Sequence, residues 1–276
     1  MTTHQAPTAG RRAQRGRASR LVRDWLRDRF GIWPLHEARN RALMAPGTWR
    51  VRRFEDAEVA ALLARHGRLG PSLVTTVIPT FRRPELLLRA VESALAQTVE
   101  DNLLLVVDDG GGLPPLPDHP RLRAVSLSRN SAVLGVVRNV GIRLSSSTYV
   151  AFLDDDNEWR PDHLAVALDR LEAGADLVYT ALERRRSDGT VLDLLGAEYD
   201  RRLLADGDNY VDINAVVVRR APDVLFSRIP RVKATLPKED WEFVHRLSAT
   251  RAPVFEPVPT VRYLVNDGSY YTDWTG

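Results

Sequence analysis

The sequence has no cysteine, which excludes disulfide bonds, thiolate catalysis and sulfur ligands for a metal. Lysine is also scarce, because Lys233 and Lys238 are the only lysines among the 39 basic residues. No apolar run in the first 20 residues resembles a signal peptide, and no window approaches the roughly 18 apolar residues of a membrane span. With a formal net charge of only +3, these absences predict a cytoplasmic protein that does not bind nucleic acid.

What is present divides the chain into three parts of different composition. Residues 1–20 are polar and rich in arginine, glycine and alanine, which is typical of a disordered basic arm. Residues 21–70 are expected to form a mainly helical N-terminal appendage. Residues 71–276 are long enough to bury a sizeable core, and we expect them to form one domain.

The appendage begins with a basic, amphipathic stretch. A helix of this kind can lie on a membrane surface, so peripheral membrane contact is one alternative. Packing against its own domain is the interpretation that we favour. Further along, residues 48–54 are expected as a short strand and residues 55–66 as a helix that ends at Gly67. The residues at helical spacing are Leu21, Val22, Trp25, Leu26 and Phe30, with Arg23, Arg27 and Arg29 beside them.

From Leu73 onward, apolar strand patterns alternate with amphipathic helix patterns. This alternation predicts the α/β class, with an open, mostly parallel sheet flanked by helices. A turn at residues 187–189 is expected to join a hairpin that ends near Leu195. The expected strands are 73–78, 103–107, 122–127, 149–153, 176–182, 215–218 and 261–265, and the expected helices are 84–97, 132–144, 161–172 and 239–248.

Carboxylates follow one of these strands directly: Asp154, Asp155 and Asp156 come after the apolar residues 149–153. Ligands bind at the carboxyl ends of strands in open α/β sheets. Three adjacent carboxylates repel one another, so they are a poor choice for packing alone. Mg²⁺ or Mn²⁺ would compensate this repulsion by binding the carboxylates, because these cations take one or two carboxylates and complete their shell with phosphates and water. The alternative is a solvated turn before the next helix.

Other phosphate-binding patterns do not match. The sequence contains neither G-x-x-x-x-G-K-[ST] nor a G-x-G-x-x-G that opens a helix after the first strand. Asp154 and Asp156 have the D-x-D spacing of an aspartyl-phosphate phosphatase, but Glu158 stands where threonine or valine belongs. The remaining candidate is a site that binds a nucleoside diphosphate across several strand ends.

Five segments, in order and with matching spacing, resemble the inverting glycosyltransferases of family 2, which have the GT-A fold. They are residues 77–84 (VIPTFRRP), 106–110 (VVDDG), 137–141 (VRNVG), 149–156 (YVAFLDDD) and 239–241 (EDW). The resemblance covers roughly residues 73–265. It implies a GT-A domain over 71–276, with a nucleotide-binding half over 71–157 and an acceptor half over 158–276.

The resemblance also implies an activity. A family member of this kind moves a sugar from a nucleotide-diphospho-sugar, most often UDP-linked, to an acceptor hydroxyl with inversion, and Mn²⁺ or Mg²⁺ is the cofactor. It leaves the acceptor open between a glycan, a lipid-linked molecule and a small molecule. Two alternatives remain: an inactive sugar-nucleotide-binding or scaffold protein, and a sugar nucleotidyltransferase, whose basic glycine-rich loop is missing here.

By position, the resemblance assigns a role to each matching residue. Asp156 would ligate the metal, Asp240 would be the general base, and Glu239 and Trp241 would lie on the acceptor side. The remaining residues would bind the nucleotide-sugar, with Asp109 accepting a hydrogen bond from the base and Asp155 approaching the ribose or sugar. They are Pro79, Thr80, Phe81, Arg82, Asp109, Arg138, Asp154 and Asp155.

Several of these residues also have plain structural alternatives. Asp108 and Asp109 could begin a turn. Arg138 could be an ordinary charge on a helix surface. Asp240 could be a helix N-terminal charge favoured by the dipole, and Trp241 could belong to the core.

The chain departs from the family pattern at two points. Gly111 follows the second aspartate pair where a serine is usual, and Asn266 or Asp267 falls at the position of a late histidine near the metal. The number of protein ligands to a metal is therefore open. Exposed aromatic residues near a terminus are otherwise unfavourable, so three of them are expected near the acceptor cleft. These are Tyr270, Tyr271 and Trp274.

Overall fold

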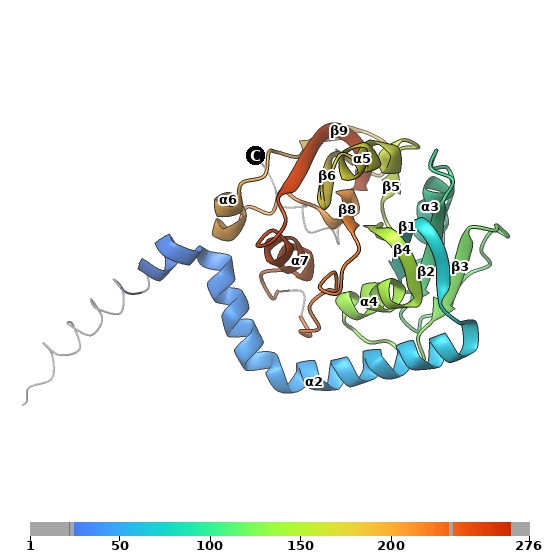
Figure 1. Cartoon of the computed structure of the whole chain (residues 1–276), viewed down its shortest axis with the longest axis horizontal. Helices are drawn as coiled ribbons and strands as arrows, with labels where there is room; N and C mark the ends of the chain where they lie inside the picture. The colour runs from blue at the N-terminus through green and yellow to red at the C-terminus, as the bar shows by residue number, and fades with distance from the viewer. Residues whose placement is uncertain (1–21, 23–24, 232–233, 266–276) are drawn as a thin grey trace, which may run out of the picture.

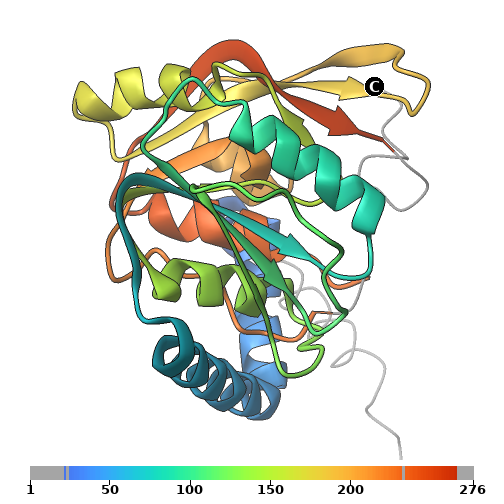
Figure 2. The same cartoon turned by 90° about the vertical axis from the view of Figure 1, so that its right-hand side faces the viewer.

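The computed structural model describes residues 22, 25–231 and 234–265. Their strands form one nine-stranded sheet with the order β3-β2-β1-β4-β8-β6-β9-β5, and β7 pairs with β6. Helices α3 (Pro84–Leu95) and α4 (Leu134–Leu144) lie on opposite sides of this sheet (Figures 1 and 2). The predicted class, an open α/β sheet flanked by helices, is confirmed.

The first half of the sheet is parallel, and its central strands are apolar because both faces are covered. Strand β1 pairs with β2 on one side and β4 on the other, in a register that joins Thr80 to Asp108 and Val77 to Phe152. The loops that follow these strands therefore leave from one edge. The strands are β1 (Leu69–Thr80), β2 (Asn102–Asp108), β3 (Leu122–Ser126) and β4 (Ser145–Phe152).

The second half of the sheet is mixed. Strands β6 and β9 are parallel, whereas β8 is antiparallel to both β4 and β6. The predicted hairpin is confirmed as β6 and β7, but β5, α6 and η1 were not predicted. The elements are β5 (Glu158–Trp159), α5 (His163–Glu172), β6 (Leu177–Arg185), β7 (Val191–Leu195), α6 (Arg201–Asp206), the 3₁₀ helix η1 (Ile213–Ala215), β8 (Val216–Arg219), α7 (Glu239–Leu247) and β9 (Pro253–Leu264).

Three buried phenylalanines hold α7 against the central sheet. The ring of Phe243 on α7 stacks on Phe226, with 4.2 Å between centroids, and meets Phe152 of β4 edge-on at 5.6 Å. Phe152 is the last residue of β4 and comes just before the three aspartates. Aromatic packing of this kind contributes beyond the area that it buries. It places the start of α7 opposite the end of β4.

Residues 32–66 form one long helix, α2 (Ile32–His66), which contains Pro46 and bends along two sides of the domain (Figure 1). The predicted helix over 55–66 with its end at Gly67 is confirmed, but the predicted strand over 48–54 is wrong. The cause is spacing: Val51 and Phe54 continue the inward face formed by Val59 and Leu62. Helical packing of this face therefore outweighs the local alternation of apolar and polar residues around Trp49.

The appendage differs from expectation in a second respect. The side chains of Trp25 and Phe30 are 61% and 49% exposed, so the favoured interpretation, packing on the domain, is wrong for these two residues. The predicted arm over residues 1–20 lies outside the described residues. No helix in the described part of the chain has the length and apolar character needed to cross a bilayer.

The inner face of α2 is fastened to the domain by a buried carboxylate. Glu55 is fully buried and accepts hydrogen bonds from Asn139 of α4 and from Arg143 and Arg228. The neighbouring Asp56 is half exposed and also pairs with Arg143, at 2.7 Å. Glu55 and Asp56 share Arg143 as a partner but differ in burial. Substituting each in turn therefore compares the contribution of a buried ion pair with that of a surface ion pair.

We expect Glu55→Gln to lower the free energy of unfolding by about 2–4 kcal/mol, because it leaves the partly buried Arg228 without its charge partner and Arg143 with only the half-exposed Asp56. Asp56→Asn is the matched control and should cost less than about 1 kcal/mol, as surface pairs do. Urea unfolding followed by circular dichroism measures both. Equal losses in the two variants would show that the buried network does not anchor α2.

Candidate active site

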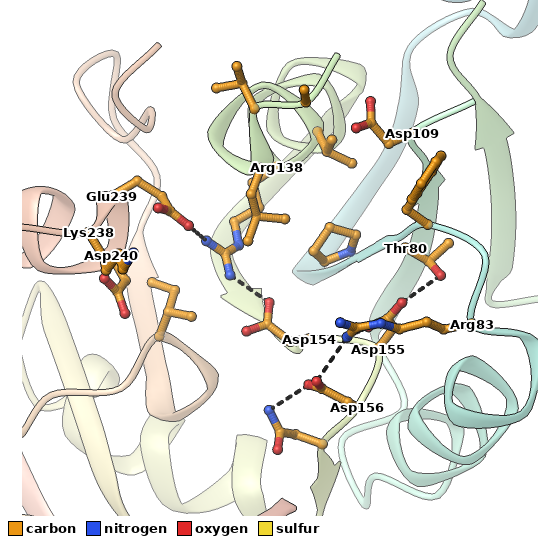
Figure 3. A pocket seen from close by; sticks show the side chains of 18 of the residues that line it. Thr80, Arg83, Asp109, Arg138, Asp154, Asp155, Asp156, Lys238, Glu239 and Asp240 are labelled. Atoms are coloured by element: carbon orange, nitrogen blue, oxygen red, sulfur yellow. Dashed lines mark hydrogen bonds and ion pairs between the residues drawn. The ribbon is translucent and has the colours of Figure 1, made fainter. Parts of the chain in front are cut away.

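A cavity of about 560 Å³ opens at the edge where β1, β2 and β4 end (Figure 3). Residues from all five sequence segments line it, so the topology brings together groups as far apart in the chain as Pro79 and Asp240. Asp109, Asp156 and Asp240 share this one hollow. The other predicted residues that line it are Pro79, Thr80, Phe81, Arg138, Asp154, Asp155 and Glu239.

The three consecutive aspartates have different partners. Asp154 pairs with Arg138 at 2.5 Å and accepts a hydrogen bond from the side-chain amide of Asn214 at 3.2 Å. Asp155 is buried and accepts hydrogen bonds from the Thr80 hydroxyl at 2.7 Å and from Arg83 at 3.1 Å. The loop thus uses its first two carboxylates largely for its own attachment.

Asp156, the third aspartate, accepts hydrogen bonds from Arg83 and, at 3.2 Å, from the side-chain amide of Asn157 (Figure 3). Its only basic partner among the described residues is Arg83, at 2.9 Å, and its side chain is 22% exposed at the cavity. Burial, together with the charges of Asp154 and Asp155, raises the pKa of Asp156 to about 6. The deprotonated form is therefore destabilised by its surroundings, and added positive charge at this point would relieve that cost.

Arg138 lines the cavity and is fully buried, with a side chain 1% exposed. It lies between the two walls, donating to Asp154 on one side and to Glu239, at 3.3 Å, on the other (Figure 3). Its Nε has no hydrogen-bond partner in the described part of the chain. The alternative that Arg138 is a helix-surface charge is therefore wrong.

Asp240 lies across the cavity from the three aspartates, on the first turn of α7 (Figure 3). Its Oδ1 accepts the backbone N–H of Trp241 at 2.6 Å. Burial and the charges of Glu239 and Asp212 raise the pKa of Asp240 to about 7, although Arg138 acts in the opposite direction. A carboxylate with a pKa near neutrality can take up and release a proton under ordinary conditions.

The second aspartate pair divides into two roles. Asp108 is buried and accepts the backbone N–H groups of Gly111 and Gly112 at 2.9 and 3.0 Å, which is the turn predicted as the alternative. Asp109 lines the cavity and accepts the N–H of Ser131 at 2.7 Å. Burial raises the pKa of Asp109, and these hydrogen bonds oppose the shift. Only Asp109 is therefore available to a ligand.

Two predicted site residues lie elsewhere. Arg82 does not line the cavity: it has a left-handed backbone with φ 56° and its guanidinium lies over the Phe81 ring. The next residue, Arg83, reaches the aspartates instead. Trp241 does not face an acceptor, because its ring is 1% exposed, packs edge-on against Trp33, and donates a hydrogen bond to the Leu204 carbonyl. Its alternative as a core residue is correct.

Some residues of the site were missed by the sequence reasoning. Asn214 accepts the backbone N–H of Asp154 at 2.6 Å, and Asp212 caps η1 and lines the cavity. Both precede the predicted strand at 215–218, and that position at a strand terminus was the available signal. Arg83 lies within the quoted segment 77–84 and Lys238 directly precedes the segment 239–241, and both line the cavity. The positions of Asn266, Asp267, Tyr270, Tyr271 and Trp274 lie outside the described residues.

The residues present fit a divalent cation in one particular way. Within the described residues, no group of three or more metal-binding side chains is arranged to hold an ion unaided. Mg²⁺ and Mn²⁺ do not need such a group where substrate phosphates and water complete the shell. Asp156 suits that mode, because its carboxylate faces the cavity and carries excess negative charge. The donor set therefore fits a cation shared with a bound phosphate ligand.

Comparison with known proteins agrees with this geometry. The model of the family described as Glycosyl transferase family 2 matches residues 75–215, about half of the chain. The succinoglycan biosynthesis protein ExoW of Rhizobium meliloti is 30% identical over 183 residues, which cover 62% of this chain and 52% of ExoW. The chain spans about half, or less, of the length of the curated relatives that it matches first.

Solved structures with low sequence identity share the fold. S. aureus TarS in complex with UDP-GlcNAc aligns with a TM-score of 0.54 at 16% identity, covering 73% of this chain and 61% of TarS. The mannosyltransferase PcManGT of Pyrobaculum calidifontis, in complex with GDP-Man and Mn²⁺, aligns with a TM-score of 0.51 at 15% identity, covering 88% of this chain and 70% of PcManGT. The fold and the sequence match agree: this chain belongs to glycosyl transferase family 2, a family of glycosyltransferase enzymes.

The unequal environments of the aspartates predict opposite effects on stability. The native pKa of Asp156 is raised, so the native state binds more protons than the unfolded state between about pH 4 and pH 6, and this site loses stability as pH rises through that window. Asp156→Asn removes the loss. We expect it to stabilise the protein at pH 8 by about 1–3 kcal/mol, and by less at pH 5.

Asp154→Asn is the matched comparison. It leaves the buried Arg138 with one charge partner fewer, and should destabilise the protein by about 2–4 kcal/mol at either pH. Thermal unfolding at pH 5 and pH 8, without added metal, measures both variants. A destabilised Asp156→Asn at pH 8 would contradict the assignment of excess negative charge to this position.

Proposed function

We propose that this chain transfers a sugar from a nucleotide-diphospho-sugar, most suitably UDP-linked, to an acceptor hydroxyl with inversion. One observation carries the proposal. Two carboxylates with raised pKa values, Asp156 and Asp240, lie on opposite walls of one cavity and come from different elements. Such a pair suits a reaction in which one side receives a leaving phosphate and the other accepts a proton.

The cavity has the size and the groups for the donor. Its volume of about 560 Å³ is within the ordinary range for small-ligand sites. At one end of the cavity, Asp109 would accept a hydrogen bond from the base of the nucleotide. Phe81 would cover the ring of that base. Support for a nucleotide-sugar comes from the structural neighbours, since TarS has been solved with UDP-GlcNAc and PcManGT with GDP-Man and Mn²⁺.

Asp156 would hold a divalent cation, with Mn²⁺ or Mg²⁺ as the expected ion. When bound, such a cation offsets the negative charge that develops on a leaving diphosphate. The chain adds positive groups of its own near this point, because Arg83 contacts both Asp155 and Asp156 and Lys238 lines the cavity. These side chains would orient the phosphates and keep the donor against the aspartate loop.

Asp240 would act as the general base. The acceptor oxygen forms its bond to the anomeric carbon as the bond from that carbon to the diphosphate breaks. The diphosphate leaves with the electron pair, and the acceptor proton passes to Asp240. Because Asp240 and the aspartate loop occupy opposite walls, attack comes from the side away from the leaving group and inverts the configuration.

The structure also bears on the two alternatives. A sugar nucleotidyltransferase needs a basic, glycine-rich loop after its first strand, whereas β1 is followed here by Phe81, Arg82, Arg83 and Pro84. A scaffold that only binds a sugar nucleotide has no need for a carboxylate with a pKa near 7 opposite the donor site. Neither alternative accounts for Asp240.

Turnover of a panel of nucleotide-sugars tests the proposal. With Mn²⁺, the wild type should bind one donor selectively, raising its melting temperature, and should slowly hydrolyse it. Asp156→Ala should lose both effects. Asp240→Asn should keep the shift in melting temperature but lose about 10²–10⁴-fold in kcat for transfer. Retained turnover in Asp240→Asn would exclude it as the base, and no donor binding in the wild type would exclude the proposed function.

The pH dependence of transfer supplies an independent test. Asp240 must be deprotonated to act, so kcat/KM should rise with pH and level off above about 7 at saturating metal. Glu239→Gln removes one of the charges that raise the pKa of Asp240. It also removes an ion-pair partner of Arg138, whose positive charge then stabilises the deprotonated Asp240 more strongly. The midpoint should therefore move to lower pH. A midpoint that stays in place or moves to higher pH would contradict this assignment.

A further inference from the structure

The outer surface of the N-terminal helical segment, residues 25–53, carries large apolar side chains that nothing covers in the described part of the chain. Trp25 is 61% exposed, Phe30 49%, Leu43 64% and Trp49 58%. We call this surface the outer helix face. The three other tryptophans whose placement is described are nearly fully buried, so the exposure of Trp25 and Trp49 is unusual for this chain. They are Trp33, Trp159 and Trp241.

Within this segment, the opposite side of α2 (Ile32–His66) is firmly attached to the domain. Trp33 packs on Trp241 at 5.4 Å between ring centroids, and Arg41 pairs with the buried Glu242 at 2.5 Å. Asn40 donates to the Leu236 carbonyl at 3.0 Å. Because the inner side of α2 is occupied in this way, Leu43 and Trp49 cannot turn inward without breaking these contacts. Trp25 and Phe30 precede the break at Gly31, where φ is 85°, and their rings contact each other edge-on at 6.3 Å. These four side chains require an external apolar partner or remain in water.

Charge is distributed very unequally along the chain. Residues 1–53 contain 13 arginines and 3 acidic residues, a formal charge of +10, while residues 54–276 carry −7. Around the exposed aromatics, several arginines have no carboxylate partner among the described residues, and Arg53 lies over the Trp49 ring at 4.8 Å. The other unpaired arginines of this face are Arg27, Arg29, Arg39 and Arg50.

Three occupants suit a face that is both basic and apolar, and charge and shape discriminate between them. A second copy of the chain would bring an equal set of arginines against the first, and like charges repel. Nucleic acid would satisfy the arginines but not Leu43, which cannot stack on a base. An anionic bilayer satisfies both, because tryptophan and phenylalanine favour the interface and the lipid headgroups attract arginine.

We propose that the outer helix face, residues 25–53, docks this chain on the surface of an anionic lipid bilayer. The contact is peripheral: Trp25, Phe30, Leu43 and Trp49 enter the headgroup region and the surrounding arginines pair with lipid phosphates. The inner side of the same helix contacts the elements that carry Lys238, Glu239 and Asp240. Docking therefore holds the cavity at a set distance from the membrane, where a lipid-linked molecule could reach it.

Co-sedimentation with vesicles tests this directly. We expect binding to phosphatidylcholine vesicles with about 30% phosphatidylglycerol, weak binding to phosphatidylcholine alone, and loss of binding in high salt. The double variant Trp25→Ser, Trp49→Ser should weaken binding about tenfold or more. The triple variant Arg27→Gln, Arg29→Gln, Arg50→Gln should weaken it by a similar factor on anionic vesicles only. All of these positions are exposed, so the fold should be kept.

Leu194→Ser is the matched control, because Leu194 is 61% exposed on β7, away from the outer helix face. It should bind vesicles as the wild type does. The proposal fails if wild type does not bind anionic vesicles or if Leu194→Ser weakens binding equally. It also fails if the tryptophan variant instead dissociates a dimer seen by light scattering, or abolishes binding to an oligonucleotide that the wild type prefers to vesicles. Donor binding and turnover in solution are measured separately, so they do not depend on this result.

Discussion

The buried guanidinium of Arg138 is the interaction on which the site depends. It is held by Asp154, which follows strand β4, and by Glu239 at the start of helix α7, so it joins two elements that are far apart in the chain. Removing a charge of this kind from water is costly unless both sides are paired. The ion pairs therefore fix the width of the cavity, and the distance between Asp156 and Asp240 follows from one side chain.

This arrangement also explains why the site tolerates so many carboxylates. Asp154 is neutralised by Arg138, and Asp155 is held by Thr80 and Arg83. Burial still raises the pKa of Asp155, and it raises the pKa of Asp156 to about 6 on one wall and those of Asp212 and Asp240 to about 6 and about 7. The deprotonated carboxylates of the cavity therefore cost the fold stability, as is common in functional sites.

Much of this could be predicted from the sequence, since apolar runs and turn residues locate most of the strands and helices, and parallel strands bring their carboxyl ends together. What could not be predicted depends on tertiary contacts. The segment around Trp49 was predicted as a strand but is helical, because its packing against distant residues outweighs the local alternation of apolar and polar residues. The left-handed backbone at Arg82 turns its side chain away from the cavity, so Arg83 contacts the aspartates instead. Asn214 was missed because its partner, Asp154, lies 60 positions away.

The short strand β5 begins two residues after Asp156 and, within the described part of the chain, pairs with β9 alone. Asn157, the next residue after Asp156, accepts the backbone N–H of Leu264, which is synthesised 107 residues later. On the ribosome, the loop with the aspartates emerges long before the strand that closes it. A growing chain therefore cannot complete this side of the pocket until residues 253–264 have left the ribosome, which delays ligand capture until β9 can pair with the sheet.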